Sequence, residues 1–395
     1  MQITVVGQGY VGLPLAIAAS IAKYTVFGLD NNQEKISVLS SGKSTIEDLS
    51  DKSIKQGIES KCYIPTNDSN VIKDSDVVLI CVPTPLSEDN RPDLTSLIGA
   101  VTTVGRNLKA GALVIVESTI EPGTCRNKIL PILIKESGLT ESEFELSYSP
   151  ERIDPTNKTW QINNTPKLVA GLTEAAANRA KEFYTKFIKS ITLCSSLEIA
   201  ETAKLLENSF RLINISFINE LSIYCQKIGI DIAEVIAAAA TKPYGFMPFY
   251  PSIGVGGHCI PVDPIYLANA AKAAGAPIRL IESADEVNLS MPGYFVGRAE
   301  EKLSGLKGKR VLVVGLSYKP NVADVRESPV MALVAGLKQK GADVSWHDDL
   351  VKAFNNEKST ALSSDFDLAI LATPHSYLDL TKLGDVPILD TRGSI

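Results

Sequence analysis

One cysteine is surrounded by residues that could give it a chemical role. Cys259 lies within the run Gly254-Val255-Gly256-Gly257-His258-Cys259-Ile260-Pro261-Val262-Asp263. The glycines would expose its thiol, and an exposed thiolate can attack an aldehyde when nearby positive charge lowers its pKa. A cysteine is as often a small buried hydrophobe, so composition alone leaves both interpretations open. His258 is adjacent but has no partners at metal-ligand spacing, so we expect no metal site.

The N-terminal segment carries glycines spaced for a dinucleotide. Gly7, Gly9 and Gly12 follow the apolar run 2–6 and precede a helix-like stretch, 13–22. In that context, backbone N–H groups and a helix N-terminus can approach a pyrophosphate. Asp30 lies eighteen residues beyond Gly12, where a carboxylate accepts from a ribose 2′-OH and repels a 2′-phosphate. The pattern therefore predicts NAD rather than NADP.

Four polar residues recur at helical spacing in a later segment: Glu201, Lys204, Asn208 and Arg211. The ordinary interpretation is a solvated helix face opposite an apolar stripe. Lys204 and Asn208 lie one turn apart, however, and could together bind an oxyanion.

Polar runs also follow three predicted strands. Glu117-Ser118-Thr119 and Tyr148-Ser149-Pro150-Glu151-Arg152 could each be a helix-start signal or line a ligand site. Lys319 and Arg326 follow the apolar run 311–314, and cations at a strand end suit phosphate oxygens.

Short buried strands that alternate with helical stretches predict an α/β fold. We expect strands at 2–6, 26–29, 77–82, 113–116, 146–149, 167–170 and 191–193. A second series is expected at 311–314, 343–346, 368–371 and 388–390, with a helix over 329–340. Such alternation favours parallel sheets covered on both faces. The chain should therefore contain two doubly wound Rossmann-like domains.

A long central helix should join these two domains. Ser195-Ser196-Leu197-Glu198 is a capping box, and apolar residues recur from Ile199 to Ile228, before Gly229. About thirty residues would span roughly 45 Å, long enough to link two lobes and contribute to a dimer core. We therefore divide the chain into 1–195, 196–295 and 296–395, with the cysteine loop in the second segment. Ligands should bind in a cleft between the two sheets.

Composition limits the possible partners. The chain has 395 residues, a net charge of −6 and six cysteines. An acidic surface disfavours nucleic acid and anionic membranes, and the few cysteines, none in a C-x-x-C pair, favour a reducing cytosol. No leader and no apolar stretch of membrane-spanning length is evident. We expect a cytoplasmic protein that binds neither nucleic acid nor membrane.

Seven motifs stand in the order found in a known family. They are Gly7 to Gly12, Cys81-Val82-Pro83-Thr84-Pro85, Glu117-Ser118-Thr119, Ser149-Pro150-Glu151-Arg152, Ala203-Lys204-Leu205-Leu206-Glu207-Asn208, Gly256-Gly257-His258-Cys259 and Asp324-x-Arg326-Glu327-Ser328. Together they resemble the UDP-glucose/UDP-N-acetylhexosamine 6-dehydrogenases, over essentially the whole chain.

The resemblance implies oxidation of a sugar C6 alcohol to a carboxylate with two NAD. Cys259 would form a thiohemiacetal and then a thioester, while Lys204 and Asn208 would hold the oxyanion. Thr119, Glu151 and Asp263 would position or activate water and shuttle protons.

The resemblance also implies binding roles. The last segment would bind the UDP-sugar, and the enzyme would be a homodimer that supplies a uronic acid for surface polysaccharide. The implied cofactor-binding residues are Gly7, Gly9, Tyr10, Val11, Gly12, Asp30, Thr84, Thr119 and Arg326. The implied substrate-binding residues are Glu151, Arg152, Lys204, Asn208, Gly256 and Lys319.

Sequence details bear on which sugar is bound. Gly-Gly-His-Cys and Arg152 resemble the N-acetylhexosamine branch, and the stretch 241–246 is similar to UDP-N-acetylglucosamine enzymes. UDP-N-acetylmannosamine and UDP-glucose are the alternatives. Ser252-Ile253 stands where relatives usually have Gly-Pro, so the loop conformation there should differ.

Two other classes of function fit the first domain. A two-electron dehydrogenase of a small hydroxy acid shares a Rossmann domain followed by helices, but it needs no exposed cysteine. A catalytically silent NAD-sensing protein would bind the cofactor without producing NADH.

Overall fold

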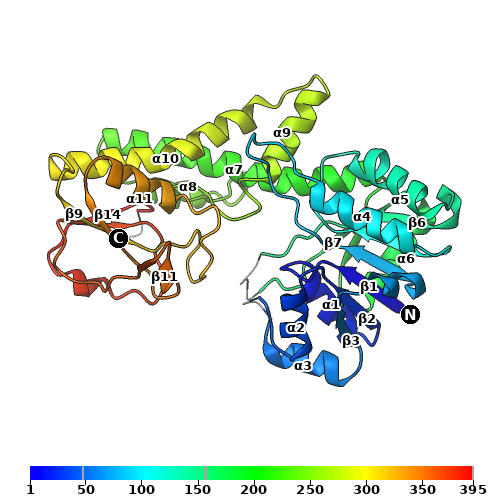
Figure 1. The fold of residues 1–395 in the computed structure, drawn as a ribbon. Helices are drawn as coiled ribbons and strands as arrows, with labels where there is room; N and C mark the ends of the chain where they lie inside the picture. Colours follow the sequence, from blue (N-terminus) through cyan, green and yellow to red (C-terminus); the bar gives the residue numbers. More distant parts are fainter. Residues whose placement is uncertain (47–48, 155–156, 158, 394–395) are drawn as a thin grey trace. The chain divides into compact units, whose positions relative to one another are not determined.

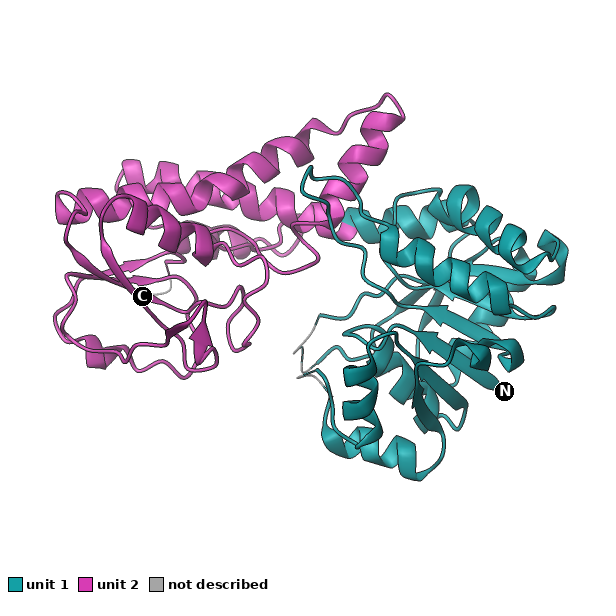
Figure 2. Cartoon of the chain, in the orientation of Figure 1, with its two compact units in different colours: residues 1–206 teal, residues 207–395 magenta. Residues whose placement is uncertain are grey.

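A computed structural model describes residues 1–46, 49–154, 157 and 159–393. The chain forms two compact units, residues 1–206 and 207–395 (Figure 2). Each unit contains a sheet with helices packed on it (Figure 1), as expected for an α/β protein. None of the described helices combines the length and hydropathy that crossing a membrane requires.

Unit 1 is built on one sheet in the order β3-β2-β1-β4-β5-β6-β7-β8. Its strands are β1 (Gln2–Val6), β2 (Thr25–Leu29), β3 (Tyr63–Thr66), β4 (Val77–Ile80), β5 (Leu113–Val116), β6 (Glu145–Tyr148), β7 (Lys167–Gly171) and β8 (Ile191–Leu193). The order reverses beside β1, as in doubly wound folds. The sequence missed β3, a short edge strand that contains Pro65.

The expectation of a wholly parallel sheet is wrong at one pair of strands. β6 and β7 run antiparallel, with Tyr148 opposite Ala170. A parallel pair needs a crossover connection, usually a helix. The described residues between these two strands form no helix, and the chain instead turns back beside β6.

Helices cover both faces of the unit 1 sheet (Figure 1). They are α1 (Gly12–Ile21), α2 (Gln33–Ser40), α3 (Asp51–Glu59), α4 (Thr95–Asn107), α5 (Leu130–Ser137) and α6 (Glu174–Thr185). The main core joins α1 and α6 to the strands, with Leu13, Ile17 and Phe183 packed on Ile3 and Leu113. This burial of apolar surface holds the strand ends, and the loops that leave them, in place.

The long helix α7 (Leu197–Lys227) begins in unit 1 and ends in unit 2. Its length agrees with the prediction, and Ser196 Oγ accepts from Ile199 N–H at its start. The predicted apolar stripe, however, is not buried within the chain. Leu206, Phe217 and Tyr224 are 60%, 61% and 57% exposed, and Ile199 and Ile228 are exposed as well. The helix has instead turned its opposite face inward.

Unit 2 contains a smaller parallel sheet in the order β10-β9-β13-β14. Its elements are α8 (Ile232–Ala240), α9 (Asp263–Ala273), α10 (Arg279–Leu303), β9 (Arg310–Val314), α11 (Val330–Gln339), β10 (Asp343–His347), β11 (Ala353–Phe354), β12 (Glu357–Lys358), β13 (Leu368–Leu371) and β14 (Ile388–Asp390). α10 lies along α7, where Ser216 Oγ donates to the Ala284 carbonyl at 2.7 Å (Figure 1). Phe295 of α10 and Leu333 of α11 then pack on the sheet.

A buried ion pair ties two strands of unit 1 together. Glu117 follows β5 and is fully buried, and Lys167 Nζ donates to its Oε2 at 2.7 Å. The Tyr184 hydroxyl donates to the other carboxylate oxygen. Burial raises the pKa of Glu117 to about 7, although the Lys167 cation opposes the rise.

This pKa predicts a stability effect that the Glu117→Gln variant should remove. Between its ordinary value and about 7, folded Glu117 holds a proton that the unfolded chain has released. The stabilisation is therefore fully present at low pH and lost as the pH rises through 7, by about 3 kcal/mol in total. Urea unfolding from pH 5 to pH 8 should show wild type losing stability relative to E117Q. A constant difference across that range would contradict the titration.

Candidate active site

The glycine loop after β1 has the shape that a dinucleotide site needs. Gly7 has φ +92°, and a Cβ there would lie 2.7 Å from the Cys81 carbonyl oxygen. A Cβ on Gly12 would lie 1.9 Å from the Gly7 oxygen, so both positions require glycine. Gly9 has open space where a Cβ would stand. A ligand can therefore approach the backbone of Gly9 closely, with the exposed Tyr10 beside it.

Asp30 stands at the end of β2 beside this loop. Its Oδ2 accepts from Gln8 N–H at 2.8 Å and from Lys35 Nζ at 2.7 Å. Burial raises the pKa of Asp30, but these hydrogen bonds and one from Asn32 outweigh it and hold the pKa below its ordinary value. The ionised carboxylate is suited to accept from a ribose hydroxyl, so the loop and Asp30 together fit NAD.

The loops after β4 and β5 are joined at the same edge of the sheet. Thr84 Oγ1 donates to the Thr119 carbonyl at 2.8 Å. The two predicted cofactor-lining threonines are thus neighbours, and Val11 is half-buried at the start of α1. The helix-start interpretation of Glu117-Ser118-Thr119 is wrong, because several loop residues separate Thr119 from the next helix.

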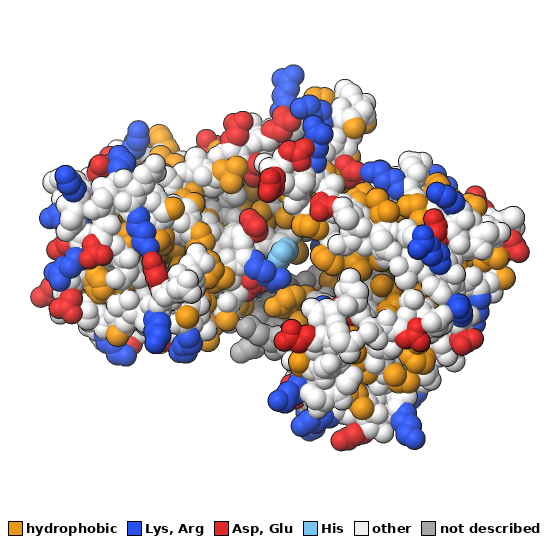
Figure 3. Space-filling model, in the orientation of Figure 1, with side chains coloured by type: hydrophobic (Ala, Val, Ile, Leu, Met, Phe, Trp, Pro, Cys, Tyr) orange, Lys and Arg blue, Asp and Glu red, His pale blue; other side chains and the backbone are white. Residues whose placement is uncertain are grey.

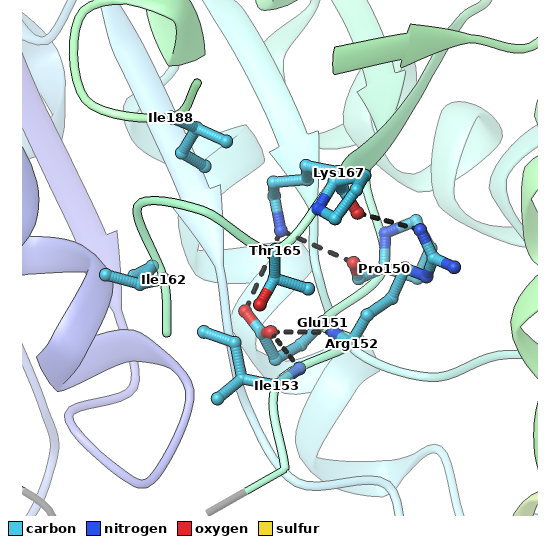
Figure 4. A pocket seen from close by; sticks show the side chains of 9 residues that line it. Pro150, Glu151, Arg152, Ile153, Ile162, Thr165, Lys167 and Ile188 are labelled. Atoms are coloured by element: carbon cyan, nitrogen blue, oxygen red, sulfur yellow. Dashed lines mark hydrogen bonds and ion pairs between the residues drawn. The ribbon is translucent and has the colours of Figure 1, made fainter. Parts of the chain in front are cut away.

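The run from Ser149 to Arg152 is likewise a loop, with no helix starting among residues 149–154. Glu151 Oε1 accepts from the Arg152 and Ile153 N–H groups, both at 2.6 Å. Arg152 Nη1 donates to the Pro166 carbonyl at 2.7 Å. These side chains line a small pocket that Lys167 closes from β7 (Figure 4).

The polar residues of α7 face inward, so the solvated-face interpretation is wrong for three of the four. Glu201 is fully buried, while Lys204 and Asn208 are 8% and 7% exposed; Arg211 alone of the four is exposed. Glu201 accepts from Gly123 N–H at 2.5 Å and from Cys125 N–H at 3.0 Å. It therefore has a structural role, whereas Lys204 and Asn208 lie on the same face further along the helix.

In unit 2, Cys259 and Asp263 belong to one compact turn. Cys259 is exposed, and its carbonyl accepts from Asp263 N–H at 2.9 Å. Asp263 opens α9 with its side chain buried, and Asn208 Nδ2 donates to its Oδ2 at 2.6 Å. The other five cysteines are buried or half-buried. The structure thus brings Asn208, Cys259 and Asp263 together within unit 2.

The cysteine loop packs closely against the segment that follows β9, because two of its glycines have no Cβ. A Cβ on Gly256 would lie 2.4 Å from the Glu327 carbonyl oxygen, and one on Gly257 would meet the Tyr318 ring. The unusual Ser252-Ile253 pair is buried, with Ile253 part of the unit 2 core. These contacts fix the loop that carries the exposed thiol.

The same segment carries the predicted cations. Arg326 lies in the loop before α11 and forms a two-pronged salt bridge with Asp324, with N···O distances of 2.5 to 3.0 Å. Lys319 is half-buried just beyond β9. Acidic and basic side chains are interspersed on the visible surface (Figure 3), so an anionic ligand would depend on local cations such as these.

Sequence reasoning missed two buried groups near these sites. Lys167 opens an apolar strand, an unusual place for lysine that could have signalled a buried partner. Asp348 follows β10 just as Asp30 follows β2, and its Oδ2 lies 3.1 Å from His375 Nε2. Within the described ranges, no cluster of three or more His, Cys, Asp or Glu side chains is arranged to hold a metal ion.

Comparisons with known proteins agree with this geometry. Models of the UDP-glucose/GDP-mannose dehydrogenase family match residues 1–188 as its NAD binding domain, 198–290 as its central domain and 312–395 as its UDP binding domain. The chain is 36% identical to the UDP-N-acetyl-D-glucosamine 6-dehydrogenase of Pseudomonas aeruginosa, over 95% of this chain and 91% of that protein.

Solved structures of named relatives share the fold across the whole chain. The UDP-D-ManNAc dehydrogenase of Pyrococcus horikoshii superimposes with a TM-score of 0.92 at 33% identity, over 99% of this chain and 95% of that one. The UDP-glucose dehydrogenase of Pyrobaculum islandicum superimposes with a TM-score of 0.91 at 26% identity, over 99% of this chain and 94% of that one. The chain therefore belongs to the UDP-glucose/GDP-mannose dehydrogenase family and is an NAD-dependent UDP-sugar dehydrogenase.

Proposed function

We propose that this enzyme oxidises the C6 hydroxyl of a UDP-N-acetylhexosamine to a carboxylate, a four-electron reaction, and that UDP-N-acetylglucosamine is the favoured substrate. The observation that carries the proposal is the exposed Cys259 thiol beside the buried Asn208–Asp263 pair. The name of the Pseudomonas aeruginosa relative supports the choice of sugar, as do His258 and Arg152. The names of the solved relatives leave UDP-N-acetylmannosamine and UDP-glucose as alternatives.

Cys259 is the proposed nucleophile. When bound, NAD accepts a hydride from the sugar carbon in each of the two oxidations. The Cys259 thiolate adds to the C6 aldehyde, and loss of the second hydride from the thiohemiacetal leaves a thioester on its sulfur. Water then releases the acid and restores the thiol. In total, the alcohol and one water yield a carboxylate, two hydrides and three protons.

Neighbouring side chains have proposed roles in stabilising charge. Lys204 and Asn208 hold the oxyanion, which suits two buried donors one helical turn apart. Asp263 receives the Asn208 amide and takes part in proton transfer with Thr119 and Glu151. A buried carboxylate and an ordered loop carboxylate are suitable acceptors for such protons.

The proposed binding residues keep the assignments made from the sequence. The residues proposed to bind NAD are Gly7, Gly9, Tyr10, Val11, Gly12, Asp30, Thr84, Thr119 and Arg326. The residues proposed to bind the UDP-sugar are Glu151, Arg152, Lys204, Asn208, Gly256 and Lys319. The open space over Gly9 and the ionised Asp30 are the features that support NAD binding.

We propose that the enzyme is a homodimer joined through α7. Leu206, Phe217 and Tyr224 form an exposed apolar stripe, and stripes of this kind usually mark an interface. A second copy presents the same stripe and can cover it symmetrically. Six cysteines with no C-x-x-C pair suit the proposed cytoplasmic location, and a UDP-uronic acid suits surface polysaccharide synthesis.

A comparison of substrates tests the choice of sugar. We expect kcat/KM for NADH formation with UDP-N-acetylglucosamine to exceed that with UDP-N-acetylmannosamine or UDP-glucose by about tenfold, because the pocket must fit one arrangement at C2. A higher value for either alternative would change the substrate but keep the chemistry. No NADH from any UDP-sugar would refute the proposed function.

The Cys259→Ser variant tests covalent catalysis. Without the thiolate, no thioester forms, so we expect fewer than two NADH per sugar and loss of uronic acid product. NADH absorbance and product mass spectrometry measure both quantities. Cys62→Ser is the matched control, because Cys62 is a half-buried thiol elsewhere in unit 1 and should keep two NADH per sugar. Full four-electron turnover by C259S would rule out the covalent route.

Charges placed on the α7 stripe test the dimer. Wild type should have twice the 42.4 kDa mass of the chain by light scattering, whereas Phe217→Glu with Tyr224→Glu should give the single-chain mass. Ile21→Glu is the control, because Ile21 is also 60% exposed but lies on α1. A wild-type monomer, or a dimer that survives both substitutions, would contradict the proposal.

A further inference from the structure

A buried lysine in unit 1 is shared by two carboxylates. Lys167 is 5% exposed, and its Nζ lies 2.7 Å from Glu117 Oε2 and 3.7 Å from Glu151 Oε2. It also donates to the Pro150 carbonyl at 3.3 Å. Burial lowers the pKa of Lys167, but the carboxylates outweigh this effect and hold the pKa above its ordinary value. The cation is therefore stabilised by these acceptors in place of water.

The position of the Lys167 ammonium group is fixed by regular elements of the fold. The side chain leaves the first residue of β7 and reaches Glu117 at the end of β5. Tyr184 of α6 donates to Glu117, and its ring lies 5.2 Å from Lys167 Nζ. Two strands and a helix thus hold one buried charge in place.

Glu151, in contrast, lies on a loop. Its Oε1 is occupied by the N–H groups of Arg152 and Ile153, while its Oε2 is the oxygen nearest Lys167. The Glu151 side chain is 17% exposed, so it lies at the boundary between the buried charges and solvent. Figure 4 shows Lys167 reaching this carboxylate from the strand behind it. Lys167, which lies 3.7 Å from Glu151 Oε2, is carried by a strand of the sheet.

We propose that Lys167, held by Glu117, is a positioning residue for the Glu151 carboxylate during sugar oxidation. The inference rests on the proposed role of Glu151 in handling water and protons. A fixed cation beside Oε2 holds the carboxylate in one orientation, so that it need not reorganise between the chemical steps. An ion pair that only joined β5 to β7 would be complete with Glu117, but here the same ammonium group also faces Glu151.

The experiment separates positioning from simple stability. Lys167→Met leaves the buried Glu117 carboxyl without its cationic partner, which should lower the melting temperature. The double variant with Glu117→Gln removes both charges and should recover much of that loss. If Lys167 positions Glu151, kcat should remain about 100-fold low in the double variant, with KM for NAD and the UDP-sugar within about twofold of wild type. Lys167→Arg keeps the charge and should restore much of kcat.

Lys109→Met provides a matched control. Lys109 also forms an ion pair in unit 1, with Asp76 at 2.9 Å, but it is 36% exposed. Its removal should leave kcat unchanged. Recovery of kcat together with the melting temperature in the Lys167→Met/Glu117→Gln variant would overturn the inference, because the pair would then serve only stability.

Glu151→Gln separates failure of the inference from failure of the proposed function. A wild-type enzyme with no UDP-sugar activity would refute both. An active wild type with a fully active E151Q would remove the role that Lys167 is proposed to support, and the inference with it. Low activity in E151Q together with low activity in the double variant is the result that supports positioning.

Discussion

The rotation of α7 about its own axis is the constraint on which the candidate site depends. Glu201 accepts two backbone N–H groups in unit 1, and that contact fixes which side of the helix faces inward. Residues three and seven positions later share this side, so Lys204 and Asn208 are buried as well. Since a helix covered on one face leaves the other exposed, the same rotation places Leu206 and Phe217 in solvent. The buried polar face and the apolar stripe are two results of one orientation.

The two Rossmann-like sheets share one hydrogen-bonding arrangement after their second strands, but its surroundings differ between them. In each, an aspartate after the second strand accepts a backbone N–H just beyond a glycine: Asp30 from Gln8, and Asp348 from Leu316. Beside Asp30, the glycine loop is open at Gly9. Asp348 is fully buried and paired with His375. Asp30 can exchange hydrogen bonds with the protein for hydrogen bonds with ribose hydroxyls. Asp348 is enclosed by protein side chains and has its partner in His375.

The sequence predicted most of what depends on local pattern. Residue spacing along the sequence was enough to predict the glycine loop, the aspartate after the second strand and the length of α7. It could not give the inward face of α7, because apolar periodicity identifies the face that avoids water but not whether this chain covers it. It also missed Lys167, whose burial depends on Glu117 fifty residues away. The antiparallel β7 likewise depends on contacts that form only after the chain turns back.

A covalent nucleophile must be reachable by substrate and yet held still, and unit 2 meets both needs through its glycines. Gly256 and Gly257 have no room for a Cβ against Glu327 and Tyr318, so the loop packs closely on its neighbour. Just beyond these contacts, Cys259 remains exposed. The sequence predicted that these glycines would expose the thiol, and they do so within a closely packed loop, because their small size lets the backbone approach its neighbours. The exposure of the thiol is thus a property of a packed loop.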